Sequence, residues 1–279
     1  MTAKRTLVMI MLSLLILALA LPAYAQDGAE DDTDALVVEH NAIRFSVDPA
    51  LASEIKVIEN DGIDPDAEIQ TPFWSILPAH VQFDFIDYPA LENAWHSPRL
   101  FVWPADEFDT YAEINPSLVM ELDTLTALVE RINDEEDHLD LSTYVTGGFR
   151  SEALPLLPLM NAGQVFRSNI EILELEWGTG IRYVTFYSQA LVPIMDTQLI
   201  YTFQGLSHDG QYYISAIFPV DSGLFPETDP QDLDLDAIAA DYDNHVSQVA
   251  LDLDALEDDA FSPSLESLDE IILSIEISG

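Results

Sequence analysis

The sequence contains no cysteine and few basic residues, with 9 Lys and Arg against 51 Asp and Glu in 279 residues, a formal net charge of −42. Without cysteine, disulfide scaffolds and metal sites built on thiolates are excluded. Because contacts to phosphate groups need clustered Lys and Arg, nucleic-acid binding is not expected. The hydrophobic share of 48% and the aromatic share of 10% can still fill a core, so the composition favours a globular protein over a disordered one.

The first 25 residues have the features of a signal peptide. Lys4 and Arg5 precede an uncharged stretch at 7–21, and small residues follow where a signal peptidase needs them. We predict cleavage between Ala25 and Gln26. The alternative, an uncleaved membrane anchor, is disfavoured because the apolar stretch is shorter than the roughly 20 residues of a spanning helix. With no Cys for lipid attachment, we expect a protein that is secreted or periplasmic, is not a lipoprotein and has no stable membrane insertion after cleavage.

Acidity is the main property of the mature chain. Cleavage would remove two of the nine basic residues and none of the acidic ones, which changes the formal charge from −42 to −44. Such a field repels nucleic acid and anionic lipid, favours a soluble monomer and attracts cations without a specific site. Halophilic adaptation and a generally acidic exported proteome both explain it. An extracellular ligand or protein remains the expected kind of partner.

The mature chain is predicted to form one α+β domain over residues 36–279, after a disordered acidic leader at 26–35. Residues 134–158 are polar and then rich in Pro and Leu, which indicates an inserted segment or linker. Strands and helices are mixed without a βαβ rhythm, which favours an antiparallel β-meander sheet with packed helices, two of them C-terminal.

Local patterns place these elements along the chain. Alternating β-rich segments predict a meander between residues 169 and 218, with hairpin-like links at 178–180 and 207–210. Apolar stripes predict a helix at 116–133 after the N-cap Asn115, a long helix from Asp236 to 256, and a further helix near 265–272. The remaining expected elements are strands at 36–47, 80–86, 100–103 and 275–277 and a short helix at 50–58.

The C-terminal part also resembles known sequences. QYYISAIFPV, a following helix and the closing SLDEIILSIEIS are similar to the end of PsbP-like α+β domains. The block GTGIRYVTFYSQ…LIYTFQGLSHDGQYYISAIFPV resembles uncharacterised exported bacterial proteins. PsbP-like domains are accessory or binding modules, so the resemblance implies a binding module rather than an enzyme.

Motifs for catalysis are missing from the sequence. It has no Gly-x-Ser-x-Gly elbow, no phosphate-binding Gly loop and no His-x-His or His-Glu-x-x-His pair. We therefore assign no catalytic or cofactor-binding residue. Glu174 and Glu176 share a strand face near Arg182 and could pair with it, although a solvated charge cluster is the commoner meaning of such a pattern.

One acidic stretch imitates a calcium-binding loop. Asp232, Asp234 and Asp236 alternate, and Asp243 falls at the twelfth place of an EF-hand count. Ala237 stands where that loop needs Gly, and Asp243 replaces the bidentate Glu. An acidic helix start that complements the helix dipole is the alternative, and it fits the following stripe better.

Three functions remain open from the sequence. The first is a noncatalytic exported module that binds a ligand or partner through Tyr183, Tyr187, Gln189 and Tyr201 on one side of the meander, with Arg182 as a further ligand-binding candidate. The second is an extracellular hydrolase acting on glycans, which would need two carboxyl groups in a Trp-lined groove. The third is a cation-stabilised structural protein of the envelope.

Overall fold

The β-rich segments of the sequence form a large antiparallel sheet in the computed structural model, which describes residues 35–65, 71–134, 139–147, 154–225 and 235–278. The predicted signal peptide, its cleavage site at Ala25 and Gln26, and all of the leader except Ala35 lie outside the described residues. Within the described part, no helix combines the length and the apolar character needed to cross a membrane.

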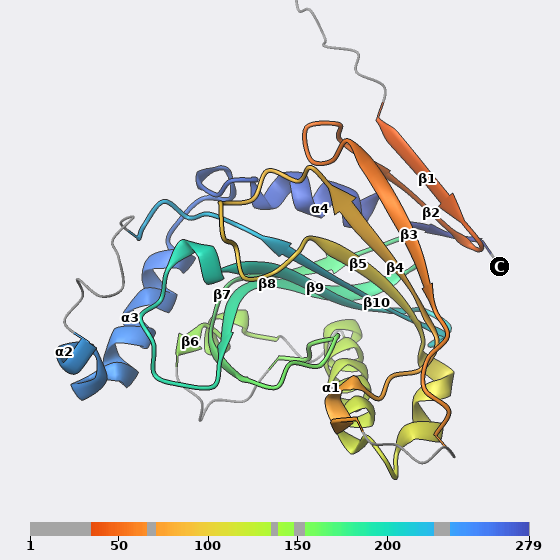
Figure 1. The fold of residues 1–279 in the computed structure, drawn as a ribbon, viewed down its shortest axis with the longest axis horizontal. Coiled ribbons are helices and arrows are strands. Elements are labelled where there is room, and N and C mark those ends of the chain that lie inside the picture. The colour runs from red at the N-terminus through yellow and green to blue at the C-terminus, as the bar shows by residue number, and fades with distance from the viewer. Residues whose placement is uncertain (1–34, 66–70, 135–138, 148–153, 226–234, 279) are drawn as a thin grey trace, which may run out of the picture. The chain divides into compact units, whose positions relative to one another are not determined.

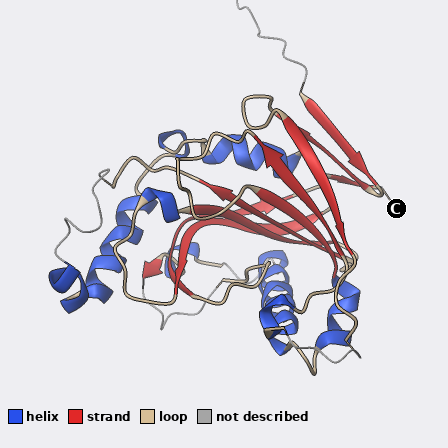
Figure 2. Cartoon of the chain, viewed as in Figure 1, coloured by secondary structure: helices blue, strands red, loops and turns tan. Residues whose placement is uncertain are grey.

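Four consecutive strands form a meander in this sheet, as predicted (Figure 2). They are β7 (Gly163–Glu174), β8 (Gly178–Ser188), β9 (Ile200–Ser207) and β10 (Tyr212–Pro219). The sheet continues from β10 through β5 (Arg99–Pro104), β4 (His80–Ile86) and β3 (Glu54–Asn60), and beyond β7 to the short β6 (Thr146–Gly147). Nearly every residue of β8, β9 and β10 is buried, so both faces of the meander are covered.

The N-terminal segment differs from the prediction in two places. Residues 36–47, expected as one strand, form a hairpin of β1 (Leu36–His40) and β2 (Ile43–Val47). Asn41 makes the tight turn possible, because Asn tolerates the left-handed conformation that this residue adopts, with φ 52°. Residues 50–58, expected as a short helix, contain most of β3, whose β-branched side chains favour the pairing with β4 that is observed.

The turn between β7 and β8 lies earlier than the predicted link at 178–180. Residues 175–177 connect the strands, and Gly180 is already inside β8. A Cβ atom at Gly180 or at its partner Gly205 on β9 would lie 2.4 Å from the ring of Phe203. Glycine is needed at both positions because this ring lies over the two strands.

One face of the sheet is covered by α3 (Tyr242–Asp254), α4 (Leu265–Leu273) and the β1–β2 hairpin, which share one hydrophobic core with sheet residues such as Val184 and Phe203 (Figure 1). The predicted last strand is confirmed as β11 (Glu276–Ile277), which pairs with β2. The long helix expected from Asp236 is instead two helices, α2 (Leu235–Ala240) and α3, because Asp241 between them is not helical, with φ −135° and ψ 39°.

The opposite face is covered by α1 (Pro116–Asn133), the 3-10 helix η2 (Ala105–Tyr111) and residues 154–159. The bounds of α1 and its N-cap residue Asn115 match the prediction, but the Asn115 side chain makes no capping hydrogen bond; its buried amide donates to the carbonyl of Ile76. In the segment 134–158, β6 pairs with β7 and residues 154–157 are buried. These parts of the segment therefore belong to the packed structure rather than to an exposed linker. The antiparallel sheet and its helices confirm the α+β class.

Candidate functional site

The five residues predicted to bind a ligand are divided between the two faces of the meander, and so are the four of them that were expected on one side. Neighbouring side chains along a strand point to opposite faces. Arg182 and Tyr201 lie toward α4, where both contact Asp269. Tyr183 and Tyr187 lie toward α1, and Gln189 is exposed after the end of β8. The prediction of a single binding surface is wrong for this reason.

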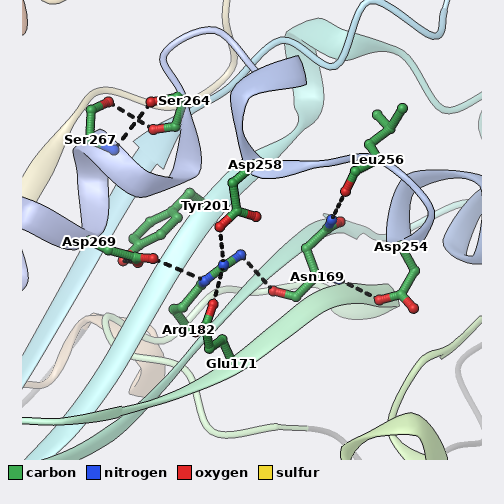
Figure 3. Close-up of polar contacts among 10 residues, drawn as sticks. All are labelled: Asn169, Glu171, Arg182, Tyr201, Asp254, Leu256, Asp258, Ser264, Ser267 and Asp269. Atoms are coloured by element: carbon green, nitrogen blue, oxygen red, sulfur yellow. Dashed lines mark hydrogen bonds and ion pairs between the residues drawn. The ribbon is translucent and has the colours of Figure 1, made fainter. Parts of the chain in front are cut away.

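Arg182 is the centre of a charge cluster beneath α4 (Figure 3). Its side chain is 3% exposed, and Nη2 lies 2.5 Å from Glu171 on β7 and 2.6 Å from Asp258. Nε lies 3.4 Å from Asp269 of α4. Nη1 donates to the carbonyl of Asn169, a β7 residue in the left-handed conformation (φ 48°) at an irregularity of the strand pairing. The cluster joins β7, β8, α4 and the segment before it.

The same three carboxylates are close enough to hold a metal ion, since one oxygen from each lies within 4.8 Å of the others. The guanidinium of Arg182 lies among these oxygens and supplies the positive charge itself. Burial raises the pKa of Asp269 to about 6, even though Arg182 and the hydroxyl of Tyr201 both favour the ionised form. The cluster is therefore a structural ion pair network. Glu174 and Glu176 are exposed near the β7–β8 turn, as the alternative of a solvated charge cluster predicts, and the carboxylate partners of Arg182 are other residues.

A pocket with different chemistry lies on the opposite face of the sheet. It has a volume of about 260 Å³, and its polar lining consists of Glu121 from α1, Gln164 and Arg167 from β7, and Tyr187 from β8. Apolar side chains of residues 154–160 complete the wall. We call this hollow the Glu121 pocket. Its lining is polar and apolar in about equal parts, and a hollow in which polar side chains converge is a candidate site for a small molecule.

Hydrogen bonds hold the polar groups of the Glu121 pocket in place. The Nε2 of Gln164 donates to the hydroxyl of Tyr187 at 2.8 Å. Its Oε1 accepts from Arg167 Nη1 at 2.6 Å and from the backbone N–H of Leu154 at 3.1 Å. Glu121 Oε2 accepts from a single backbone N–H, that of Leu156, at 2.8 Å. The pocket is thus a fixed arrangement of side chains on two strands, a helix and the segment above them.

Burial changes the acidity of two groups in this pocket. It raises the pKa of Glu121 to about 7, against which the N–H of Leu156 acts only partly. Burial also raises the pKa of Tyr187, with a further contribution from the negative charge of Glu121. Tyr187 is therefore neutral at physiological pH, whereas Glu121 titrates close to it. A carboxyl group with a strongly raised pKa in a pocket is a candidate functional residue.

The sequence analysis did not identify Glu121 as a site residue, although its spacing from neighbouring Leu residues indicates that it lies on the apolar side of the helix. It follows Leu118 by three residues and precedes Leu125 by four, which places it on the buried side of the predicted helix. Only the structure shows that β7 and β8 bring polar side chains to the same place. Gln189, which was predicted, lies beside the pocket and donates to the carbonyl of Asn161. Met160, Ala162 and Gly163 line both the Glu121 pocket and the shallower hollow next to Gln189.

The calcium candidates are only partly described. Asp232 and Asp234 lie outside the described residues, while Asp236 and Asp243 are exposed in the first turns of α2 and α3. Acidic residues at these places complement the helix dipoles. Among the described residues, the group of acidic or His side chains close enough to hold a metal ion is the one around Arg182.

A second hollow of about 440 Å³ lies between the β1–β2 hairpin and the edge of the large sheet. Its lining includes His40, which lies 3.0 Å from Glu59, and His80, whose ring stacks on Trp103 with 4.0 Å between centroids. Burial lowers the pKa of His80, so this ring is neutral at physiological pH. The hollow offers the ring surface of His80 and the close contact of His40 with Glu59, and its described lining contains no Trp.

Comparisons with family models, with curated proteins and with solved structures found no match for this chain, so its resemblance to PsbP-like domains and to exported bacterial proteins stays a prediction.

Proposed function

We propose that this protein is an exported, noncatalytic module that binds a small ligand in the Glu121 pocket. The observation that carries the proposal is the convergence of Glu121, Gln164, Arg167 and Tyr187 on one small hollow with apolar walls. The hydrogen bonds of Gln164 fix two of these side chains before any ligand arrives. Such preorganisation supports binding because little side-chain freedom is lost when the ligand enters.

The composition of the pocket favours binding over glycan hydrolysis. Glycosidases need two carboxyl groups about 5–10 Å apart on either side of the scissile bond. Of the described residues that line the Glu121 pocket, one is acidic, and none is His or Trp. The export expected from the N-terminal sequence would place the ligand outside the cytoplasm.

A fragment screen on the mature protein tests this function. Small neutral, anionic and cationic fragments are added to ¹⁵N-labelled protein, and amide shifts are followed by NMR. We expect at least one fragment to shift amides of residues 156–167, and Tyr187→Phe to weaken its binding. Tyr212→Phe is the matched control, because that ring lines the separate hollow beside His40.

Two results would contradict the proposal. Fragments that shift amides only at other surfaces would show that the pocket does not bind ligands of this size. Turnover of a glycan or ester substrate that disappears in Glu121→Gln would show that the pocket is catalytic. A screen with no binder in the pocket counts against the proposed function in the same way as the first result.

A further inference from the structure

Glu121 has a free hydrogen-bond acceptor inside the pocket. Its Oε2 accepts the N–H of Leu156 at 2.8 Å, and the Oε1 atom has no hydrogen-bond partner among the described residues. Glu121 is half-buried, and a carboxylate that is partly withdrawn from water is normally satisfied by several donors or by a cation, because the loss of hydration is unfavourable for a charged group. Half of the accepting capacity of Glu121 is thus left for a molecule in the pocket.

The cation that lines the same pocket does not neutralise Glu121. The guanidinium of Arg167 on β7 donates to Gln164 Oε1 at 2.6 Å and to the carbonyl of Tyr144 at 3.2 Å. The charge of Glu121 acts instead on three tyrosines, Tyr183 and Tyr187 of β8 and Tyr213 of β10, and burial raises the pKa of each. These neutral phenols do not compensate a negative charge.

The other walls of the pocket set the size and polarity of its ligand. Leu156, Leu159 and Met160 present apolar surface next to the carboxylate. At roughly 30 Å³ per water-sized group, a hollow of about 260 Å³ takes an organic molecule with on the order of ten non-hydrogen atoms. One carboxylate is a poor site for a hard divalent cation, which needs six or more oxygen ligands.

The electrostatic field of the whole protein also favours a cationic ligand. A formal charge of −42 raises the local concentration of small cations and lowers that of anions. A cationic ligand is therefore favoured both at long range and by the uncompensated carboxylate in the pocket.

We propose that the Glu121 pocket binds a small primary ammonium compound, with the ammonium group on Oε1 of Glu121 and the hydrocarbon part against Leu156, Leu159 and Met160. This inference rests on the proposed function of the same pocket and adds the chemical class of the ligand. A primary ammonium fits better than a quaternary one, because its N–H groups can donate to Oε1. Quaternary ammonium groups are held by aromatic cages, whereas Tyr187 is the one aromatic residue in the described lining.

Three probes of equal length test the charge requirement: pentylamine, 1-pentanol and pentanoate. Their binding to the mature protein at pH 8 is measured by NMR shifts and by calorimetry. We expect pentylamine to shift amides of residues 156–167 and to bind at least tenfold more tightly than the other two. Because a hydrogen bond to a charged group contributes about 1.5–3 kcal/mol, Glu121→Gln should weaken pentylamine binding by roughly 10- to 100-fold.

Glu130→Gln is the matched control, because Glu130 is an exposed residue of the same helix. It removes the same formal charge from the protein and should leave the affinity for pentylamine within about twofold. An equal loss in both variants would show that only the overall field matters and would overturn the inference. Circular dichroism and thermal melting of each variant confirm that the fold is retained.

The probe series separates this inference from the proposed function. If 1-pentanol or pentanoate binds in the pocket as tightly as pentylamine, the ammonium assignment is wrong while the pocket remains a binding site. If pentylamine shifts no amide of the pocket but another fragment does, the ammonium assignment is again wrong and the pocket is again a binding site. If nothing binds there, the proposed function fails together with the inference.

Discussion

Replacing Glu121 with Gln should stabilise the protein at alkaline pH. In the folded chain, burial raises the pKa of this carboxyl group from 4.5 to about 7. At Glu121 the folded state therefore binds more protons than the unfolded state between about pH 4 and pH 7. The contribution of this group to the stability of the fold decreases as the pH rises through this range. Above pH 7 the ionised Glu121 lowers the free energy of unfolding by its full amount, and below pH 4 this destabilisation is absent.

The size of the effect follows from the pKa difference. One pKa unit corresponds to 1.36 kcal/mol, so a shift from 4.5 to about 7 gives an upper value of about 3 kcal/mol at pH 8. Because the pocket gives Glu121 some contact with solvent, we expect Glu121→Gln to gain about 1–3 kcal/mol at pH 8. Near pH 4 both side chains are neutral and the variant should match the wild type. The Gln side chain keeps an oxygen that can accept the N–H of Leu156.

Urea denaturation at several pH values between 4 and 8.5 measures this difference. The other acidic groups contribute equally to both proteins, so the difference curve isolates the contribution of residue 121. Glu130→Gln, on the exposed side of α1, should change stability by less than about 0.5 kcal/mol at every pH. A flat difference curve for Glu121→Gln, or a loss of stability that grows with pH, would refute the reasoning.

Three further predictions concern other parts of the molecule. Arg182→Leu should lose about 3–5 kcal/mol of unfolding free energy in urea, because it leaves the buried carboxylate of Asp269 without its cation. Arg44→Leu, which breaks an exposed pair, should lose less than about 1 kcal/mol, and equal losses would contradict the prediction. Gly205→Ala should lower the free energy of unfolding by about 1–3 kcal/mol, because the added Cβ would meet Phe203. Gly210→Ala has open space around the Cβ and should lose only about 1 kcal/mol, because its φ is positive. A larger loss in Gly210→Ala than in Gly205→Ala would contradict the packing argument. NaCl and CaCl₂ at equal ionic strength should raise the melting temperature equally, and a micromolar effect of calcium would instead reveal a specific site.

The parts of the fold that were predicted correctly are elements whose formation depends on the residue pattern within the element itself. The helix at 116–133 has a regular apolar stripe and a Pro in its first turn, and both bounds are confirmed. The meander from β7 to β10 has β-rich segments separated by turns. Two of the failures occurred where one residue changed the local conformation: Asn41 divides a strand into a hairpin, and Asp241 divides a helix in two.

The site was predicted less well because its residues are distant in the sequence. Tyr187 was named as a ligand-binding residue and does line the pocket, but its position on the same face as Tyr183 and not Tyr201 follows from the strand register. Glu121 comes from a helix 66 positions before Tyr187 in the chain. Likewise, Arg182 meets Asp269 only because α4 packs on β8 from the far end of the chain. Alternation within a strand cannot indicate which element will cover each face.

The buried carboxyl group of Asp269 and the half-buried one of Glu121 differ in how their charges are compensated. Asp269 faces the guanidinium of Arg182 and accepts the hydroxyl of Tyr201, so its charge belongs to a closed network. Glu121 accepts one backbone N–H and forms no ion pair with a described residue, although Arg167 lines the same open hollow. A charge that lowers stability at physiological pH and serves no internal pair needs another reason to be retained. Binding of a cation from outside the protein is such a reason, because it would supply to Glu121 what Arg182 supplies to Asp269.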